Sequence, residues 1–110
     1  MAKIETQMLK GTLDNAILMI IAQGETYGYA LLQQLQDAGF GVIPEGTVYP
    51  LLLKMQRNGL IVAHRHAIAT GPDRKYYRIT AAGEAHLQAF LPQWKQLTTA
   101  MNRLIAGQEG

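Results

Sequence analysis

The chain contains no cysteine among its 110 residues. Without thiols it can form neither a disulfide framework nor a thiolate-based metal or redox site. It also has no long hydrophobic run, because its longest apolar segment, residues 16–22, is far too short to cross a bilayer. Residues 1–10 are of mixed polarity and contain no apolar core of a signal peptide. We therefore expect a single compact domain in the cytoplasm.

Residue groups typical of catalysis are missing as well. The sequence shows no serine–histidine–acid set, no paired carboxylates and no nucleotide-binding loop. Its glycines are scattered and do not form a loop that could hold a phosphate. We expect neither an enzyme nor a protein that needs a cofactor.

Positive charge is concentrated in one segment. The formal net charge is only +2, but residues 54–78 contain six basic residues and a single acidic one, Asp73. This segment carries +5, whereas the remainder of the chain carries −3. Its basic residues are Lys54, Arg57, Arg65, Arg74, Lys75 and Arg78. A basic segment on a slightly acidic body is typical of a protein that binds a polyanion such as DNA.

Hydrophobic periodicity predicts two helices in the first third of the chain. Apolar residues recur at spacings of three and four over residues 6–22. Gly11 weakens the first half of this helix, because glycine costs about 1 kcal/mol relative to alanine in a helix interior. A second helix is predicted over residues 27–37, with Thr26 as its N-cap.

A third helix is predicted over residues 45–58. Its core-facing residues recur at spacings of four and three: Val48, Leu52 and Met55. Pro50 is tolerated only near a helix start, where its missing N–H has no helical acceptor, so the helix should begin close to Gly46. Asn58-Gly59 indicates its end.

Two strand-like runs follow, residues 60–66 and 75–80, and Gly71-Pro72-Asp73 between them supplies turn residues. Thr80 then caps a fourth helix, with Glu84 in its first turn. The expected fold is mainly α with a small β-hairpin, that is, a winged helix-turn-helix followed by a long C-terminal dimerisation helix.

The fourth helix carries a seam typical of helix pairing. Its apolar residues alternate spacings of three and four, as in a heptad repeat: Leu87, Phe90, Trp94, Leu97, Met101 and Leu104. Pro92 should kink this helix near residues 88–91. We expect a DNA-binding domain over residues 1–80, a dimerisation helix over residues 81–106 and a tail over residues 107–110.

Candidate DNA contacts lie on the third helix and the hairpin. Thr47 and Tyr49 occupy the N-terminal turn, where a recognition helix meets base edges and phosphates. Arg74 and Lys75 lie in the hairpin, within reach of a phosphate backbone or a minor groove. The residues predicted to bind double-stranded DNA are Thr47, Tyr49, Pro50, Lys54, Arg57, Arg74 and Lys75. The alternative is an ordinary short helix and loop with solvated charges.

Trp94, the only tryptophan, falls on the seam of the last helix. It is either a packed aromatic residue of the core or a platform for a ligand. If two copies of the helix pair across a twofold axis, the two Trp94 rings approach each other and can sandwich a flat apolar or cationic compound. Phe90 and Leu97, on the same seam, complete the predicted ligand-binding set.

His64 and His66 share one face of a strand, because side chains in a strand alternate with a period of two. Two histidines at this spacing can bind a metal ion if a third ligand is near. No cysteine or carboxylate is placed to help in the sequence. We therefore expect solvated or phosphate-adjacent histidines and no metal site.

Five short motifs, in this order, resemble the PadR-like family of bacterial transcriptional regulators. They are Leu9-Lys10-Gly11-Thr12-Leu13, Thr26-Tyr27-Gly28-Tyr29, Gly46-Thr47-Val48-Tyr49-Pro50, Asn58-Gly59-Leu60-Ile61 and the segment from Gly71-Pro72 to Thr80. The resemblance implies a winged-helix homodimer that represses at an inverted-repeat operator and is released by a small aromatic or drug-like effector. The single C-terminal helix is similar to that of a compact subgroup, in some members of which a tryptophan lines a drug-binding pore. Trp94 occupies the matching place.

Three positions depart from the family pattern: Ala30, Leu53 and Gln56 stand where charged residues are common. These departures leave the operator sequence open. Leu51 and Leu53 also suggest an apolar surface on the third helix, which would suit a winged-helix protein-interaction module without a role in DNA binding. A DNA binder that responds to no ligand is the other alternative.

Overall fold

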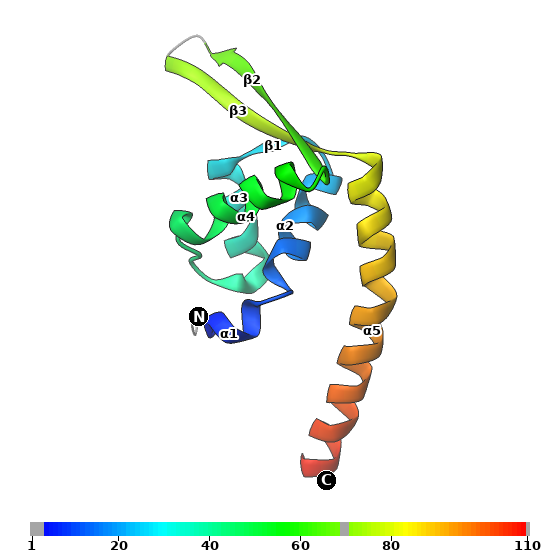
Figure 1. The fold of residues 1–110 in the computed structure, drawn as a ribbon. Coiled ribbons are helices and arrows are strands. Elements are labelled where there is room, and N and C mark those ends of the chain that lie inside the picture. The colour runs from blue at the N-terminus through cyan, green and yellow to red at the C-terminus, as the bar shows by residue number, and fades with distance from the viewer. Residues whose placement is uncertain (1–3, 69–70, 110) are drawn as a thin grey trace.

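The structure, a computed structural model, describes residues 4–68 and 71–109 (Figure 1). The helices are α1 (Thr6–Leu9), α2 (Leu13–Ala22), α3 (Gly28–Leu35), α4 (Glu45–Arg57) and α5 (Ala81–Glu109), and a π-helical turn, η1 (Gln36–Phe40), follows α3. The strands are β1 (Thr26–Tyr27), β2 (Ile61–Ile68) and β3 (Gly71–Ile79). This is a winged helix-turn-helix followed by a long C-terminal helix, so the predicted fold class is confirmed.

The central helix of the core is α2. It contacts α3, α4, α5 and β3. Its fully buried residues are Ile17, Leu18 and Ile21, and the fully buried residues of α3, α4 and β2 are Leu31, Leu35, Val48, Leu52 and Ile61. Burial of one such aliphatic side chain stabilises the fold by about 1.5–3 kcal/mol. This core fixes the position of α4 on the body.

The sheet has three antiparallel strands in the order β1–β3–β2. The hairpin of β2 and β3 is the wing, and it extends beyond the helical body (Figure 1). Pairing continues to Ile68 and Gly71, so both strands are longer than predicted. Gly71-Pro72-Asp73 therefore belongs to β3 and is not the turn, and the connecting residues 69–70 lie outside the described residues. The two-residue strand β1 was not predicted.

The first predicted helix, over residues 6–22, is in fact two helices with a bend at residues 10–12. Gly11 has a φ of 75°, a left-handed conformation that ends α1. Asn15 Nδ2 donates a 3.2 Å hydrogen bond to the Gly11 carbonyl and holds the bend. The prediction was wrong because it treated Gly11 as a weak helical residue, whereas Gly11 adopts a conformation that a helix excludes.

Thr26 does not cap the second helix. It lies in β1, and its hydroxyl donates a 3.0 Å hydrogen bond to Gln34 Oε1 on the side of α3. The N-cap of α3 is Tyr27, whose side chain makes no capping hydrogen bond. The α-helix ends at Leu35, before the predicted residue 37, and η1 contains Gly39 with a φ of 112°.

The end of α4 is set by backbone hydrogen bonds, as the Asn58-Gly59 pair predicted. Gly59 has a φ of 76°, and its amide donates to the Gln56 carbonyl at 3.1 Å. The Leu60 amide donates to the Met55 carbonyl at 3.0 Å. These two bonds form a Schellman motif, which satisfies the last carbonyls of the helix. The predicted core-facing residues are buried: Val48, Leu52 and Met55.

The helix begins at Glu45 as predicted, but the prediction was wrong that the N–H missing at Pro50 has no helical acceptor. Because the helix begins at Glu45, the N–H that Pro50 lacks would have paired with the carbonyl of Gly46, which is itself helical. Gly46 is exposed, so solvent can bond to its carbonyl and the helix tolerates the loss.

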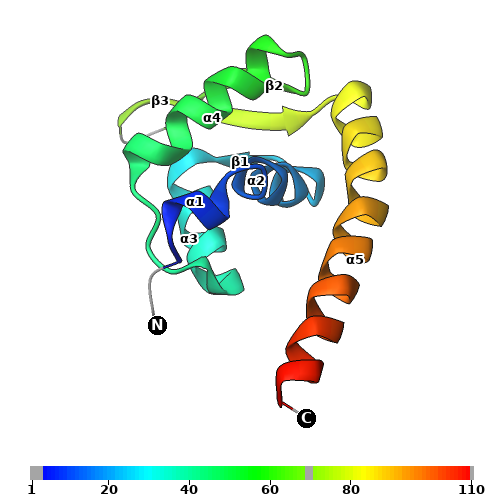
Figure 2. The same ribbon diagram turned by 60° about the horizontal axis from the view of Figure 1, so that its bottom comes forward.

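Thr80 caps α5 as predicted, because the Gly83 amide donates to Thr80 Oγ1 at 3.0 Å. The helix continues to Glu109, so residues 107–109, predicted as part of a tail, are helical. It passes through Pro92 without interruption, and both views show gentle curvature rather than a sharp kink (Figures 1 and 2). Its first part packs against α2, and the remainder extends away from the body.

Candidate nucleic-acid interface

One face of α4 is buried and the opposite face is open to solvent. The predicted DNA contacts on this helix are all exposed: Thr47, Tyr49, Pro50, Lys54 and Arg57. Pro50, Leu53 and Arg57 follow one another at spacings of three and four, so they share the outermost row. Leu53 is 51% exposed and was missed as a candidate contact, although an apolar side chain there suits the methyl group of thymine.

Tyr49 has a structural role besides its predicted role at DNA. Its ring packs over the backbone of Gly28 at the start of α3, where an added Cβ would lie 2.7 Å from Tyr49 Cε1 and Oη. The side chain is still 40% exposed. Tyr49 therefore joins α4 to α3 and still leaves part of its side chain exposed.

Tyr77 of β3 belongs to the buried core at the inner face of the wing. Burial raises the pKa of its hydroxyl, Tyr49 nearby raises it further, and the Arg65 guanidinium lowers it. Tyr77 therefore stays neutral well above physiological pH.

The wing presents two faces with different cations. Arg65 pairs with Lys75, and both side chains share a face with the buried Tyr77, because side chains alternate along a strand. Lys75 Nζ lies 5.6 Å from the centre of the Tyr77 ring. Arg74 points to the opposite face, where its guanidinium lies 4.3 Å above the ring of Tyr27. The two predicted wing contacts, Arg74 and Lys75, thus lie on opposite faces. Lys75 pairs with Arg65, which was not among the predicted DNA contacts.

A groove of about 670 Å³ lies beside α4. Its other walls are α1, the bend after it and the segment 40–44. On the α4 side it is lined by Thr47, Leu51 and Lys54. Leu51 is half-buried there and packs against the core, so it does not add to an apolar patch on the outer face of the helix.

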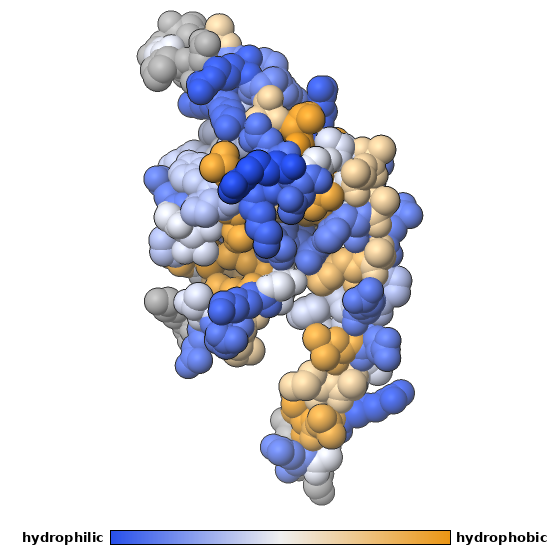
Figure 3. Space-filling model, viewed as in Figure 1, coloured by the Kyte–Doolittle hydropathy of each residue, from blue (hydrophilic) through white to orange (hydrophobic). Residues whose placement is uncertain are grey.

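The free part of α5 carries an uncovered apolar stripe. Its exposed apolar residues are Leu91, Trp94, Leu97, Met101, Leu104 and Ile105, with exposures from 37% at Leu91 and Trp94 to 69% at Leu104. Apolar side chains are visible along the part of this helix that leaves the body (Figure 3). Phe90 stacks on Trp94 with ring centres 6.0 Å apart. The predicted ligand-binding residues Phe90, Trp94 and Leu97 thus lie in sequence along one helix, next to an apolar surface that the described chain leaves open.

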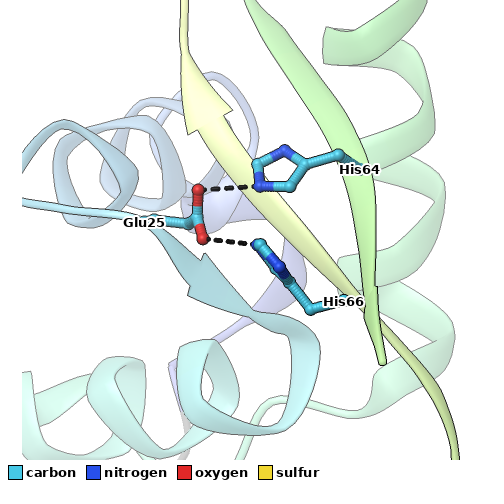
Figure 4. A network of polar contacts seen from close by, with 3 residues as sticks. All are labelled: Glu25, His64 and His66. Carbon is cyan, nitrogen blue, oxygen red and sulfur yellow. Dashed lines mark hydrogen bonds and ion pairs between the residues drawn. The ribbon is translucent and has the colours of Figure 1, made fainter. Parts of the chain in front are cut away.

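The two strand histidines lie beside a carboxylate, contrary to the prediction. His64 Nε2 is 2.8 Å from Glu25 Oε2, and His66 Nε2 is 3.0 Å from Glu25 Oε1 (Figure 4). Glu25 immediately precedes β1, and the pairing of β1 with β3 brings it next to the wing. Sequence spacing alone gave no sign of this third residue.

Comparison with known families decides the identity. A model of the transcriptional regulator PadR-like family matches residues 17–89, from within α2 into α5. The chain belongs to the PadR-like family of transcriptional regulators. As a PadR-like protein it is a DNA-binding regulator of transcription and not an enzyme.

Solved PadR-like structures share the fold over most of the chain. A PadR-like transcriptional regulator from Bacillus cereus is 46% identical with a TM-score of 0.82, covering 91% of this chain and 97% of that chain. A transcriptional regulator from Streptococcus is 42% identical with a TM-score of 0.79, covering 91% and 98%. The transcriptional regulator Rv3488 of Mycobacterium tuberculosis is 39% identical over 71 residues, which span 64% of each chain.

The long helix of this PadR-like chain is not a membrane span. Within residues 4–68 and 71–109, no helix combines the length and the apolar character needed to cross a bilayer. The large exposed apolar residues of α5 form a stripe, as their heptad spacing predicted.

Replacing Gly28 with alanine should displace Tyr49, because the new Cβ would collide with its ring. We expect Gly28→Ala to lower the free energy of unfolding by about 1–3 kcal/mol. In a Tyr49→Ala background the same change should be neutral or stabilising, since alanine favours a helix more than glycine does. Urea unfolding of the four proteins of this double-mutant cycle measures the coupling. An equal effect in both backgrounds would show that Tyr49 does not fill the space.

Proposed function

We propose that the protein is a homodimeric repressor that binds an inverted-repeat operator in double-stranded DNA and is released by a small planar aromatic effector at the dimer interface. The observation that carries this proposal is the division of α4 into two faces. Its core face is fully closed by the body, whereas the opposite face and the adjoining cations of the wing remain exposed. Such a helix beside a basic hairpin suits major-groove binding.

In this proposal α4 enters the major groove. Thr47 and the exposed part of Tyr49 meet base edges or phosphates at the N-terminal turn, and Lys54 neutralises a phosphate. Leu53 lies on the outermost row, where it can contact a thymine methyl group, and Arg57 on the same row can donate to a guanine or a phosphate. The apolar Leu53 therefore does not require a protein partner.

The wing is proposed to hold the flanking backbone. Arg65 and Lys75 share the wing face that carries the buried Tyr77, and β2 contacts α4, so they are proposed as phosphate contacts next to α4. Arg74 is proposed to reach the backbone from the other face. Its stacking on Tyr27 restricts that reach.

A second copy of this chain is proposed to cover the apolar stripe of α5. The helix has 29 residues and is therefore about 43 Å long, at 1.5 Å per residue. Its alternating spacing of apolar residues is that of a helix that pairs with a like helix. A twofold axis through this pair would present two copies of α4 to two half-sites, which lie about 34–36 Å apart in successive major grooves.

The effector is proposed to bind between the two copies of Trp94. Each Trp94 stacks on Phe90 and keeps 37% of its surface exposed in the single chain. Facing copies would form a pair of indole plates around a planar compound, and Leu97 would add apolar contact. A compound held there would change the packing of the α5 helices and so the positions of the two α4 helices.

Alanine at Arg65 or Lys75 should weaken DNA binding and reduce its dependence on salt, because each lost phosphate contact releases one counterion fewer. The slope of log affinity against log salt should fall by about one for each variant. Arg74→Ala should reduce it less, since Tyr27 holds that side chain. Fluorescence anisotropy with a labelled operator measures the slopes, with Lys95→Ala on α5 as the control. Unchanged slopes for both Arg65→Ala and Lys75→Ala would remove this wing face from the interface.

Leu97→Glu should separate the dimer, because it places a charge on the apolar seam of α5. Loss of the second half-site contact should weaken operator binding by about 100-fold or more. Gln96→Glu adds the same charge on the other side of the helix and should leave the dimer intact. Sedimentation equilibrium gives the mass of each variant. A Leu97→Glu protein that remains dimeric would show that two copies pair elsewhere.

A planar aromatic compound that does not itself bind DNA should quench the emission of Trp94, the only tryptophan. It should also weaken operator binding, and by linkage the operator should weaken its binding by the same factor. Trp94→Ala should abolish binding of the compound in calorimetry. Quenching without any effect on DNA binding would instead support a regulator that responds to no ligand at this site.

A further inference from the structure

Three side chains that DNA binding and dimerisation leave unused converge midway along the wing. Glu25 comes from the segment between α2 and β1, and His64 and His66 come from β2 (Figure 4). Both imidazoles direct Nε2 at the carboxylate, with distances of 2.8 and 3.0 Å. One ligand atom from each residue lies within 4.8 Å of the other two.

Packing holds the two imidazole rings in place. The ring centres of His64 and His66 are 4.7 Å apart and nearly perpendicular, at 80°. His66 also makes an edge contact with Tyr76 of the neighbouring strand, at 4.7 Å and 81°. The rings are thus oriented by the strand face and by Tyr76 and not only by hydrogen bonds to Glu25. A site oriented in this way loses less conformational freedom when it takes up an ion.

The geometry points to a binding site for a divalent transition-metal ion, of the zinc type, formed by Glu25, His64 and His66. Two imidazole nitrogens and one carboxylate are the protein donors of open zinc sites, in which a fourth position is left for water. Small movements of the side chains bring donors spaced this closely to the usual distances of about 2.0–2.2 Å from a common ion.

The donor set also selects the class of metal. Magnesium and calcium require mostly oxygen ligands, and this site offers one carboxylate. Imidazole nitrogen bonds well to zinc, copper and nickel, so the site is expected to bind these ions and to exclude magnesium.

Metal binding replaces the present hydrogen bonds. In a neutral histidine that donates from Nε2 to the carboxylate, Nε2 carries the proton, whereas Nε2 must be unprotonated to bind an ion. Each ring then binds the ion through an unprotonated Nε2. The side chains of Glu25 and His64 are about one-third exposed, and that of His66 is about half exposed, so an ion can enter from solvent.

An ion at this site would join the segment ahead of α3 to the wing. Glu25 precedes β1 and α3 directly, and the histidines lie on the strand that carries Arg65. Occupancy would therefore fix the wing relative to the helix-turn-helix. This effect on DNA binding rests on the proposed function, whereas metal binding itself does not.

The first test is zinc uptake by the full chain without an affinity tag, after treatment with a chelator. Isothermal titration with zinc chloride should give one ion per chain, titration with magnesium should give none, and cobalt should produce the visible absorption of a four-coordinate site. Glu25→Gln, His64→Gln and His66→Gln should each weaken zinc binding by at least about 10-fold, the lower limit seen even for residues that only support a ligand. The matched control is His86→Gln, which removes the third histidine of the chain. This residue lies on α5, so the variant should bind zinc as the parent does.

Absence of zinc uptake would overturn the site, and so would equal binding by the parent and all three site variants. All four positions are partly or fully exposed, and circular dichroism checks that each variant is folded.

A second measurement separates this site from the proposed function. Operator affinity is measured with and without zinc for the parent and for His66→Gln. Zinc should change the affinity of the parent alone. DNA binding by a protein that takes up no zinc would overturn the metal site and leave the repressor proposal intact. Zinc uptake by a protein that binds no DNA would overturn the repressor proposal and leave the metal site intact.

Discussion

Thr80 fixes the direction of α5 relative to the DNA-binding half of the molecule. Its amide donates to the Leu60 carbonyl at 3.0 Å, and its hydroxyl donates to the Gly59 carbonyl at 2.7 Å. The same hydroxyl oxygen accepts the amide of Gly83 at 3.0 Å. One residue thus joins the end of α4, the start of β2, the end of β3 and the start of α5. Gly83 permits this joint, because a Cβ at that position would collide with the Leu60 carbonyl.

The elements predicted best from the sequence are those whose first and last residues are set by signals within a few residues of each end. For α4 the apolar row, Pro50 and Asn58-Gly59 all act within a few residues, and the helix was placed almost correctly. The role of Gly11 was misjudged, because glycine can either weaken a helix or end it. Only the backbone angle φ, which the sequence does not give, distinguishes the two. Thr26 was misassigned because its partner in the sheet, Tyr77, is distant in the sequence. Local propensity cannot show such a competing partner.

The candidate sites show the same limit at the level of side chains. Period-two alternation correctly placed His64 and His66 on one face, but Glu25 reaches them only through the pairing of β1 with β3. The positions of the wing cations likewise depend on the register between β2 and β3. That register pairs Lys75 with Arg65 and directs Arg74 to Tyr27. Alternation along one strand predicts which face of the sheet a side chain occupies. Its neighbours on other strands are known only once the fold is known.

In the proposed homodimer, the joint at Thr80 would let the direction of α5 set the spacing of the two α4 helices. Trp94 lies fourteen residues after Thr80, which is about 21 Å along the helix at 1.5 Å per residue. If the joint is rigid, a change of about 5° in the direction of α5 at Trp94 moves Thr80 and the attached α4 by about 2 Å. Twofold symmetry of the proposed dimer would apply the same shift to the other chain. The spacing of the two half-sites on DNA stays near 34–36 Å, so the two α4 helices would no longer match it. In the proposed repressor, a ligand at Trp94 would therefore weaken operator binding without contacting α4, because the hydrogen bonds of Thr80 would transmit the change as a rigid rotation.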